Sequence, residues 1–258
     1  MCGILAYFDR NHHSSQSVME SINSLESIHY RGPDSAGIAL INTKNRNTQL
    51  FKRNDEGAYI CEGRDLINLN FSTEKFDLIL GHKRLSIIDL SDAGFQPMIG
   101  VDGSILVYNG EIYNYRRVNE QLKASFGFQP ESTSDTETLI NSLRFRGPDA
   151  MKDLNGMWAK VLWDNSSSKL IVSRDRFGVK PLYSYSSDPN KLLLVSEINQ
   201  LKAFDIFNFE LNVPVAKIFL SEGRINYSRE TLVRNVYSLT PGAYAHIDLN
   251  EPISVKTV

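Results

Sequence analysis

The sequence is divided into short apolar runs, each about the length of one β-strand, and this limits the folds that the chain can adopt. Such runs occupy residues 2–8, 78–80, 105–108 and 192–195, and each is bounded by polar or turn-forming residues. A membrane-spanning helix needs roughly 20 consecutive apolar residues. The runs therefore predict a soluble, strand-rich protein without a membrane-spanning segment.

Periodicity predicts both strands and helices. Short apolar or alternating segments that end at turn residues are typical of strands. They are residues 2–8, 36–41, 49–52, 77–82, 104–108, 157–163, 170–174, 182–186, 192–196 and 243–248. Apolar residues at helical spacing predict helices near residues 15–28, 115–125, 136–146, 199–204 and 213–220. Strands with helices before and between them indicate an α+β fold in which helices cover the sheets.

Length and composition narrow the class of protein. A chain of 258 residues suits one large domain or two modest ones, and we find neither an internal repeat nor a linker-like boundary. Its 41% hydrophobic and 22% charged residues are ordinary for a globular protein. With 28 basic and 30 acidic residues, the net charge of −2 gives no strong field toward nucleic acid or anionic lipid. Nucleic acid and membrane are therefore not expected partners, while a homo-oligomer remains open.

The two cysteines, Cys2 and Cys61, are too few for a disulfide framework, which predicts a reducing compartment. The apolar N-terminal run has no basic region before it and meets Asp9 and Arg10 at once, so it does not resemble an export signal. We therefore expect a cytoplasmic protein.

No metal-binding or phosphate-binding motif is present in the sequence. Cys61 has no companion at metal-ligand spacing, and His12 and His13 fit no zinc pattern. The glycine-rich loops that cradle phosphates are also missing. We expect no metal site and no cofactor in this chain.

Cys2 is the first candidate for chemistry. If Met1 is removed, the thiol and a free α-amino group belong to the same residue. The pKa of an α-amine is near 8 and that of a thiol near 8.5, so the amine can accept the thiol proton near neutral pH. The alternative is that Cys2 is a small hydrophobic residue at the start of a buried strand, and position alone favours that reading.

Asn109 and Gly110 follow a predicted strand and offer two donors for an oxyanion. One is the side-chain amide of Asn109, and the other is the backbone N–H of Gly110. An isolated Asn-Gly pair, however, is more typical of a hairpin turn. The sequence pattern leaves both interpretations open.

Charged residues provide candidates for binding an α-amino acid. Arg84 can hold a carboxylate and Asp135 an ammonium group. Taken singly, Arg84 is more typical of a surface ion pair, and Ser134 or Asp135 of a helix cap. The charge-rich segment 173–183 fits either a buried, salt-bridged corner or interface, or a solvated loop.

Taken together, the sequence resembles the class II glutamine amidotransferase domain. Within that family it is most similar to the N-terminal glutaminase half of glutamine-hydrolysing asparagine synthetases. Short ordered motifs carry the resemblance, and they lie at residues 1–4, 31–35, 81–89, 96–98, 108–114, 134–137, 154–157, 174–183 and 196–198.

The resemblance implies an N-terminal-nucleophile hydrolase fold with four layers in the order αββα, in which two antiparallel sheets lie between helical layers. It also implies that one glutamine amidotransferase type 2 domain spans residues 1–258. The implied reaction is hydrolysis of L-glutamine to glutamate and ammonia.

The resemblance also assigns roles by matching position. Cys2 attacks the side-chain amide carbon of glutamine, and its α-amine transfers the proton to the leaving ammonia. The side chain of Asn109 and the N–H of Gly110 stabilise the oxyanion. The expected substrate contacts are Arg84 for the α-carboxylate, the backbone of Leu85, Ser86, Ile87 and Ile88 along the pocket, and Glu111 and Asp135 for the α-ammonium.

Two departures from the family are visible. The family commonly has His before Arg-Gly-Pro-Asp, whereas this chain has Tyr30 there and His29 one residue earlier. We expect this change to affect loop positioning. No Ser-Gly-Gly-x-Asp-Ser pyrophosphate loop occurs in the sequence. ATP and Mg are therefore expected only in a synthetase domain or subunit outside it, which receives the ammonia for asparagine biosynthesis.

Two alternatives to that function remain. The domain could supply ammonia to another acceptor, such as a sugar or a cell-surface precursor. It could also be a non-catalytic regulatory domain that binds glutamine.

Overall fold

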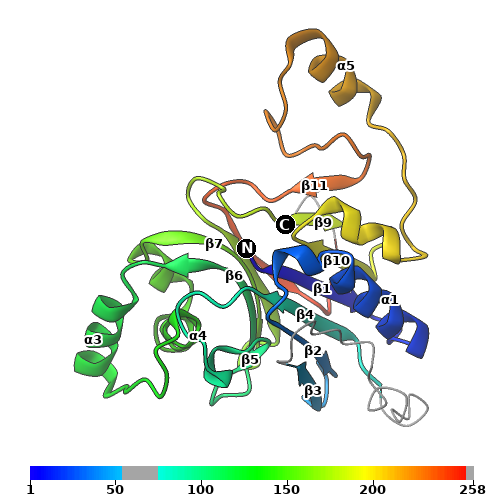
Figure 1. The fold of residues 1–258 in the computed structure, drawn as a ribbon. Coiled ribbons are helices and arrows are strands. Elements are labelled where there is room, and N and C mark those ends of the chain that lie inside the picture. Colours follow the sequence, from blue (N-terminus) through cyan, green and yellow to red (C-terminus); the bar gives the residue numbers. More distant parts are fainter. Residues whose placement is uncertain (54–74, 254–258) are drawn as a thin grey trace.

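The computed structural model describes residues 1–53 and 75–253. Their strands form two sheets in which the paired strands run antiparallel. Figure 1 shows α1 (Ser15–Glu26) lying over one sheet, and α3 (Tyr115–Phe126) and α4 (Asp135–Arg146) beside the other. The predicted α+β class with four layers is thereby confirmed.

The larger sheet has seven strands. Their order is β11 (Val236–Ser238), β9 (Tyr183–Tyr185), β10 (Lys191–Val195), β1 (Gly3–Asp9), β4 (Leu78–Arg84), β2 (Ser35–Ile41) and β3 (Thr48–Arg53). The smaller sheet has five strands, in the order β12 (Tyr244–Asp248), β8 (Lys169–Arg174), β7 (Gly156–Asp164), β6 (Ile105–Ile112) and β5 (Met98–Ile99). The short strands β5 and β11 were not predicted.

The core has three layers, and alternation along the strands creates them. On β1, Ile4 and Phe8 face a cluster shared by the two sheets, whereas Leu5 faces a cluster shared with α1. The N-cap of α1 is Ser14, whose side chain accepts a hydrogen bond from the N–H of Ser17. A third cluster joins the smaller sheet to α3 and α4.

The described helices include α5 (Val213–Glu222) and four short 3₁₀ helices. The 3₁₀ helices are His29–Arg31, Asp92–Gly94, Gly147–Lys152 and Ile198–Ala203. The helix predicted near residues 199–204 is thus a 3₁₀ turn, as is common in short connections. None of the helices in the described residues has the length and apolarity required to cross a bilayer.

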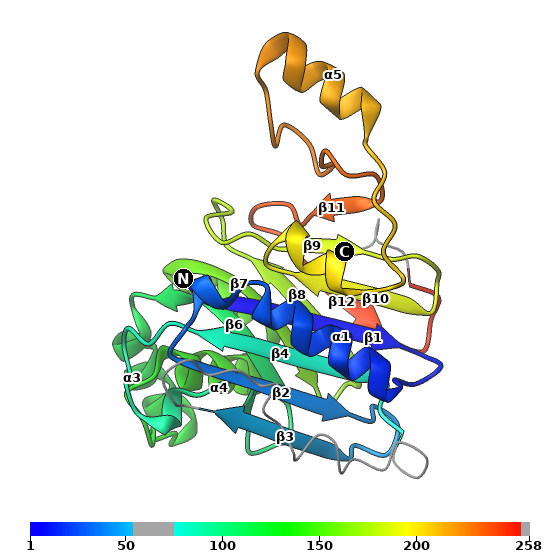
Figure 2. The same cartoon turned by 45° about the vertical axis from the view of Figure 1, so that its right-hand side comes forward.

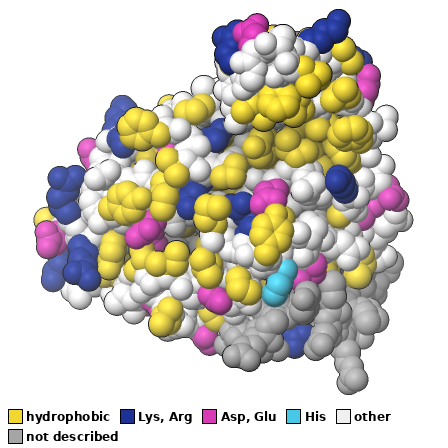
Figure 3. Space-filling view, turned by 45° about the horizontal axis from the view of Figure 1, so that its top comes forward, with side chains coloured by type: hydrophobic (Ala, Val, Ile, Leu, Met, Phe, Trp, Pro, Cys, Tyr) yellow, Lys and Arg dark blue, Asp and Glu magenta, His cyan; other side chains and the backbone are white. Residues whose placement is uncertain are grey.

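Residues 209–235, which we call the arm, carry α5 away from the two sheets (Figures 1 and 2). Figure 3 shows hydrophobic side chains gathered on this part of the surface. The exposed apolar side chains of the arm are Phe209, Leu211, Val213, Phe219, Leu220, Ile225 and Tyr227.

The hairpin interpretation of Asn109 and Gly110 is wrong, because both lie inside β6. Asn109 is opposite Ala159 and Gly110 is opposite Trp158 on β7. A Cβ on Gly110 would lie 2.3 Å from the carbonyl oxygen of Met157. Glycine is therefore required here for close backbone approach, not for a turn.

Candidate active site

The ends of several elements meet around one pocket. Cys2 directly precedes β1, and Arg84 ends the neighbouring strand β4. Asn109 comes from β6 of the other sheet, and Asp135 begins α4. Gly3 is opposite Lys83 in the β1–β4 pair, so the register places Cys2 beside the end of β4. All four side chains line the pocket.

The pocket brings together every predicted site residue except Ser86. The predicted residues that line it are Cys2, Arg84, Leu85, Ile87, Ile88, Asn109, Gly110, Glu111 and Asp135. The backbone N–H of Ser86 donates to the carboxylate of Asp34 at 2.7 Å. The predicted contact of Ser86 with the substrate stays a prediction.

The Cys2 thiol lies against the backbone of Leu85. Its Sγ is 3.4 Å from the Leu85 nitrogen and 3.6 Å from the Leu85 oxygen. Burial raises the pKa of the Cys2 thiol, and the nearby cations of Arg84 and Lys180 offset part of that rise. A thiol in this setting needs a base to become a nucleophile near neutral pH.

Asn109 presents an unused donor. Its side-chain Nδ2 is buried and has no hydrogen-bond partner among the described residues. The residue is only 1% exposed, although it lines the pocket. A buried amide without an acceptor costs free energy, so such groups commonly have a functional reason.

The N–H of Gly110 is directed away from β7. Two alternate residues of the same strand show this direction: Tyr108 N–H donates to the Gln96 side chain at 2.6 Å, and Ile112 N–H donates to Asp135 at 2.8 Å. Strand N–H groups two residues apart point the same way. The Gly110 N–H, which lies between them, therefore points toward the pocket side of β6.

Arg84 is not the surface ion pair that its charge alone suggests. It is buried, and its guanidinium donates to the carbonyl oxygens of Ser91, at 3.1 Å, and Asp89. It also lies 5.2 Å from the centre of the Phe95 ring. These contacts fix a cation in the wall of the pocket.

Asp135 is the first residue of α4, and two donors on β6 hold its carboxylate in place. Its Oδ2 accepts hydrogen bonds from the Tyr108 hydroxyl at 2.9 Å and the Ile112 N–H at 2.8 Å. Burial raises the pKa of the Asp135 carboxyl. The N-cap of α4 is Ser134, whose hydroxyl accepts from the Thr136 N–H. Ser134 thus performs the predicted capping, and Asp135 faces the pocket.

Among the other residues that line the pocket, sequence reasoning missed Gln96, Tyr108 and Lys180. Gln96 and Tyr108 lie in quoted motifs, but nothing in the sequence indicates the bonds between Gln96, Tyr108 and Asp135. Lys180 belongs to the charge-rich segment 173–183 and was not assigned a role.

Segment 173–183 is a partly buried corner, held mainly by hydrogen bonds to the backbone. Asp175 is fully buried and accepts from the N–H groups of Trp158, Phe177, Val179 and Lys180. The guanidinium of Arg174 donates to the carbonyl oxygens of Gly178 and Lys180 within the segment and of Leu239 outside it. The segment therefore combines the two predicted alternatives, because Asp175 and Lys180 are buried whereas Phe177 and Val179 are exposed. Hydrogen bonds to the backbone take the place of the predicted salt bridges.

This corner places Lys180 in the pocket wall. Lys180 is 6% exposed, and its backbone is fixed by Asp175 and Arg174. Burial lowers the pKa of its ammonium, whereas the Cys2 thiol and Glu111 favour its charged form. The charged form of this ammonium lowers the pKa of the Cys2 thiol and so favours the thiolate.

The raised pKa of Cys2 predicts how its reactivity depends on pH. At neutral pH the buried thiol is protonated, so its alkylation by iodoacetamide should keep rising as the pH passes 9. Lys180→Met removes a cation that lowers this pKa, and the alkylation rate at pH 8 should fall roughly threefold to tenfold. Peptide mass spectrometry follows Cys2 separately from Cys61.

Lys152→Met is the control for this experiment, because the side chain of Lys152 is 78% exposed and pairs with Asp149. It should leave the alkylation rate unchanged. Equal rates for Lys180→Met and the parent protein would show that Lys180 does not influence the thiol.

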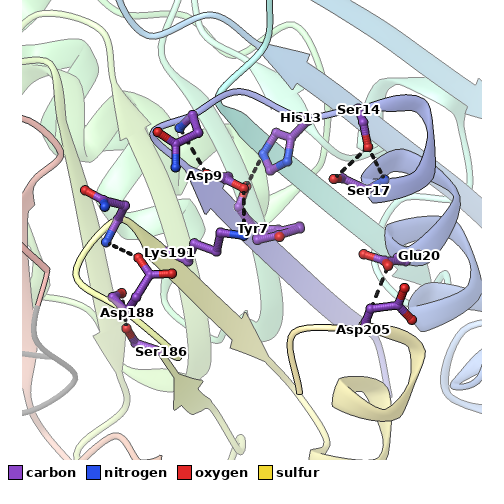
Figure 4. Close-up of polar contacts among 12 residues, drawn as sticks. Tyr7, Asp9, His13, Ser14, Ser17, Glu20, Ser186, Asp188, Lys191 and Asp205 are labelled. Carbon is purple, nitrogen blue, oxygen red and sulfur yellow. Dashed lines mark hydrogen bonds and ion pairs between the residues drawn. The ribbon is translucent and has the colours of Figure 1, made fainter. Parts of the chain in front are cut away.

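A second polar cluster lies at the other end of β1, away from the pocket (Figure 4). Nε2 of His13 donates to the carbonyl oxygen of Tyr7 at 3.0 Å, and burial lowers the pKa of His13 to about 4. His13 is therefore neutral and supports the fold. Across residues 1–53 and 75–253, no group of three or more His, Cys, Asp or Glu is placed to hold a metal ion. Cys61 lies outside the described residues.

Comparison with known proteins now identifies the family. Residues 58–256 match a family described as a glutamine amidotransferase domain, and this span is most of the chain. The chain belongs to the glutamine amidotransferase domain family. This amidotransferase domain is an enzyme domain, as predicted. The matched span includes Arg84, Asn109 and Asp135, whereas Cys2 lies ahead of it.

Curated relatives place the domain near asparagine synthetases. The chain is 30% identical over 269 residues to the putative asparagine synthetase (glutamine-hydrolysing) 2 of Methanocaldococcus jannaschii, covering 97% of this chain and 45% of that protein. It is 33% identical over 261 residues to the amidase chry2 of Gibberella zeae, covering 97% of this chain and 33% of that protein. The chain thus spans less than half the length of either relative.

A solved structure agrees with the fold. The glutamine phosphoribosylpyrophosphate amidotransferase of B. subtilis matches with a TM-score of 0.60 and 21% identity, covering 78% of this chain and 43% of that one. At this identity the likeness concerns the fold alone. It confirms the predicted arrangement of two antiparallel sheets between helices.

Proposed function

We propose that this amidotransferase domain hydrolyses L-glutamine to glutamate and ammonia with Cys2 as its nucleophile. The main support is that the Cys2 thiol shares one pocket with the unpartnered amide of Asn109. A thiol can attack an amide carbon, and a fixed donor can stabilise the negative oxygen that results. The pocket therefore combines the two groups that acyl transfer requires.

The first half of the reaction forms a thioester. After removal of Met1, the free α-amine of Cys2 takes the thiol proton, and the sulfur attacks the side-chain amide carbon. The carbonyl oxygen becomes an oxyanion, which accepts hydrogen bonds from Asn109 Nδ2 and the Gly110 N–H. The protonated α-amine then gives its proton to the amide nitrogen. The C–N bond breaks, and ammonia leaves.

The second half regenerates the thiol. The α-amine takes a proton from water, and the resulting hydroxide attacks the thioester carbon. The same two donors stabilise the second oxyanion. When the C–S bond breaks, the sulfur recovers its proton from the amine, and glutamate leaves.

The charged wall of the pocket supports recognition of an amino-acid substrate. Arg84 contributes a buried cation for the α-carboxylate, and Leu85, Ile87 and Ile88 form the adjacent wall. Asp135 and Glu111 contribute carboxylates for the α-ammonium. Because both charges lie in a partly desolvated site, an amide that lacks the amino-acid head should be strongly disfavoured.

We further propose that the ammonia passes to an ATP-dependent domain or subunit of the asparagine-synthetase type. The relative from M. jannaschii bears that name and is more than twice as long as the aligned region. ATP and Mg chemistry is assigned to that partner and to no residue of this chain. Similarity to an amidase supports the alternative that the ammonia acceptor is another compound.

The direct test is an assay of protein whose N-terminal residue is Cys2, established by intact mass. Glutamate and ammonia should appear in equal amounts from L-glutamine. Simple amides without the amino-acid head should give far less product. A mature protein that releases neither product, alone or with a candidate synthetase partner, would contradict the proposed function. Adding aspartate and ATP with that partner separates an asparagine-forming system from other acceptors.

Asn109→Ala should lower kcat about 100-fold and leave KM within about threefold, because the lost donor acts mainly on the oxyanion. Steady-state glutaminase kinetics measure both constants. The control is Asn141→Ala, since Asn141 is also buried but donates to the Glu137 carbonyl oxygen within α4. An increase in KM without a fall in kcat would assign Asn109 to substrate binding instead.

Asp135→Asn should raise KM for glutamine about tenfold or more, because the ammonium loses its counter-charge in ground and transition states alike. The asparagine oxygen can still accept from Tyr108 or Ile112, so the fold should persist. Thermal unfolding checks that expectation. An unchanged KM in a folded variant would remove Asp135 from the substrate site.

A further inference from the structure

We propose that Glu197 and Tyr30 are positioning residues for Cys2, which act through Arg31. The inference rests on the proposed function, because it concerns the nucleophile of that reaction. Tyr30 and Arg31 belong to the 3₁₀ turn after α1, and Glu197 follows β10. Two segments distant in the sequence thus meet at the residue that precedes β1.

The contacts form a continuous chain to the Cys2 backbone. Arg31 Nε donates to the carbonyl oxygen of Cys2 at 3.0 Å. Arg31 Nη1 donates to Glu197 Oε1 at 2.6 Å, and the Tyr30 hydroxyl donates to the other oxygen, Oε2. Both carboxylate oxygens of Glu197 therefore accept a hydrogen bond. The bond from Arg31 Nη1 to Glu197 orients the guanidinium whose Nε contacts Cys2.

Burial makes this arrangement sensitive to charge. The side chain of Arg31 is 6% exposed and that of Glu197 is 21% exposed. A largely buried guanidinium that loses its counter-charge is strongly destabilised in its position. We therefore expect Arg31 to shift toward solvent when Glu197 becomes neutral.

The segment around Glu197 also holds the next part of the N-terminal strand. Ser196 Oγ accepts a hydrogen bond from the Ile4 N–H at 2.9 Å, and the Ser196 N–H donates to the Ile4 carbonyl oxygen at 3.2 Å. Arg31, which pairs with Glu197, adds a hydrogen bond to the carbonyl oxygen of Cys2. Glu197 thus sits where it can couple the β10 side of the sheet to the nucleophile.

The orientation of the Cys2 backbone matters for the chemistry. Its carbonyl carbon is bonded to the Cα that carries the α-amine and, through Cβ, the thiol. Rotation of this peptide group therefore redirects both reacting groups at once. A displacement of about 1 Å at a reacting centre can cost roughly 100-fold in rate.

Tyr30 is the residue at which this chain departs from the common family motif. His29, one position earlier, lies with Nδ1 3.3 Å from Lys83 Nζ and so faces another partner. Tyr30 is 67% exposed, so removing its hydroxyl leaves no buried cavity. Tyr30→Phe therefore isolates the hydrogen bond to Glu197.

The test compares Glu197→Gln, Tyr30→Phe and the double variant in protein with a mature Cys2 terminus. We expect kcat for glutamine hydrolysis to fall about tenfold in Glu197→Gln and about twofold to threefold in Tyr30→Phe. KM should change by less than about twofold, because Arg84, Glu111 and Asp135 are outside this chain of contacts. Tyr30→Phe should have no further effect when Glu197 is already Gln.

Glu26→Gln is a matched control. Glu26 forms a comparably buried ion pair, with Lys83 at 2.8 Å and a side chain that is 14% exposed. Its partner is Lys83 of β4, so this variant leaves the Arg31–Glu197 ion pair in place. We expect Glu26→Gln to lose about as much thermal stability as Glu197→Gln but to keep its kcat. That result would show that the fall in kcat of Glu197→Gln comes from the position of Cys2 and not from general destabilisation.

The outcomes distinguish this inference from the proposed function. If the parent protein is active and Glu197→Gln keeps its kcat, or changes only KM, the positioning role is wrong and the function stands. If the parent protein releases no glutamate, the positioning role is tested by hydrogen exchange. The rate is measured on the N-terminal peptide that contains the Ile4 amide. Faster exchange in Glu197→Gln than in Glu26→Gln supports the positioning role, and equal exchange overturns it.

Discussion

Cys2→Ala should abolish glutamine hydrolysis, with a fall in kcat/KM of at least about 1000-fold. The oxyanion donors and the charged wall remain in this variant, but no sulfur is left to form the thioester. Because Cys2 precedes β1, we expect the loss of its thiol to leave the sheet intact. Glutamate release from L-glutamine is the measurement.

The control measurement asks whether the Cys2→Ala protein is folded and still binds glutamine. Near-unchanged thermal unfolding and stabilisation by glutamine would show that the pocket persists without the thiol. Cys61→Ala provides a second comparison, since it removes the other cysteine of the chain. Hydrolysis by Cys2→Ala at the parent rate would exclude the mechanism.

Retention of Met1 should reduce turnover by on the order of 10²- to 10⁴-fold, because the nitrogen of Cys2 then remains in an amide and cannot act as a base. Because burial raises the pKa of the Cys2 thiol, the thiol then stays protonated near neutral pH without a base to accept its proton. Met1 also lines the pocket, so a retained Met1 takes up space beside Cys2. Both effects act on the first step of the reaction.

Two preparations of the same sequence test this second prediction, one mature at Cys2 and one with Met1 blocked from removal by an N-terminal extension. Intact mass establishes each N-terminus beside the glutaminase assay. Equal kcat values would mean that another group accepts the thiol proton. Recovery of activity after proteolytic cleavage directly before Cys2, which removes the extension together with Met1, would link the loss to the α-amine itself.

Much of the fold follows from local sequence. Alternation along β1 separates Ile4 and Phe8 from Leu5, and the structure buries them in two different layers. Ser14 begins α1 as its N-cap. These features depend on neighbouring residues only, so periodicity and capping predict them.

Asn109 and Gly110 show where local reasoning fails. An Asn-Gly pair favours a turn by its intrinsic conformational preferences. The strand continues instead because β7 offers a partner from Gly156 onward, and Gly110 fits closely against the backbone at Met157. Long-range pairing outweighs the local preference.

The charged residues show the same limit. The charge pattern in segment 173–183 suggests salt bridges, but the backbone groups of the corner satisfy Asp175 and Arg174. Lys180 reaches the pocket only because that corner is folded in this way. Sequence does not indicate which polar group a charge will meet.

The sequence by itself determined the residue types, their order and the family that they resemble. It thereby named Cys2, Arg84, Asn109 and Asp135 before any geometry was known. The tertiary structure decided that these residues share one pocket and that the Gly110 N–H is directed toward it. The physical reason is that the direction of a donor and the distance between side chains depend on strand register and sheet packing, which join residues far apart in the chain.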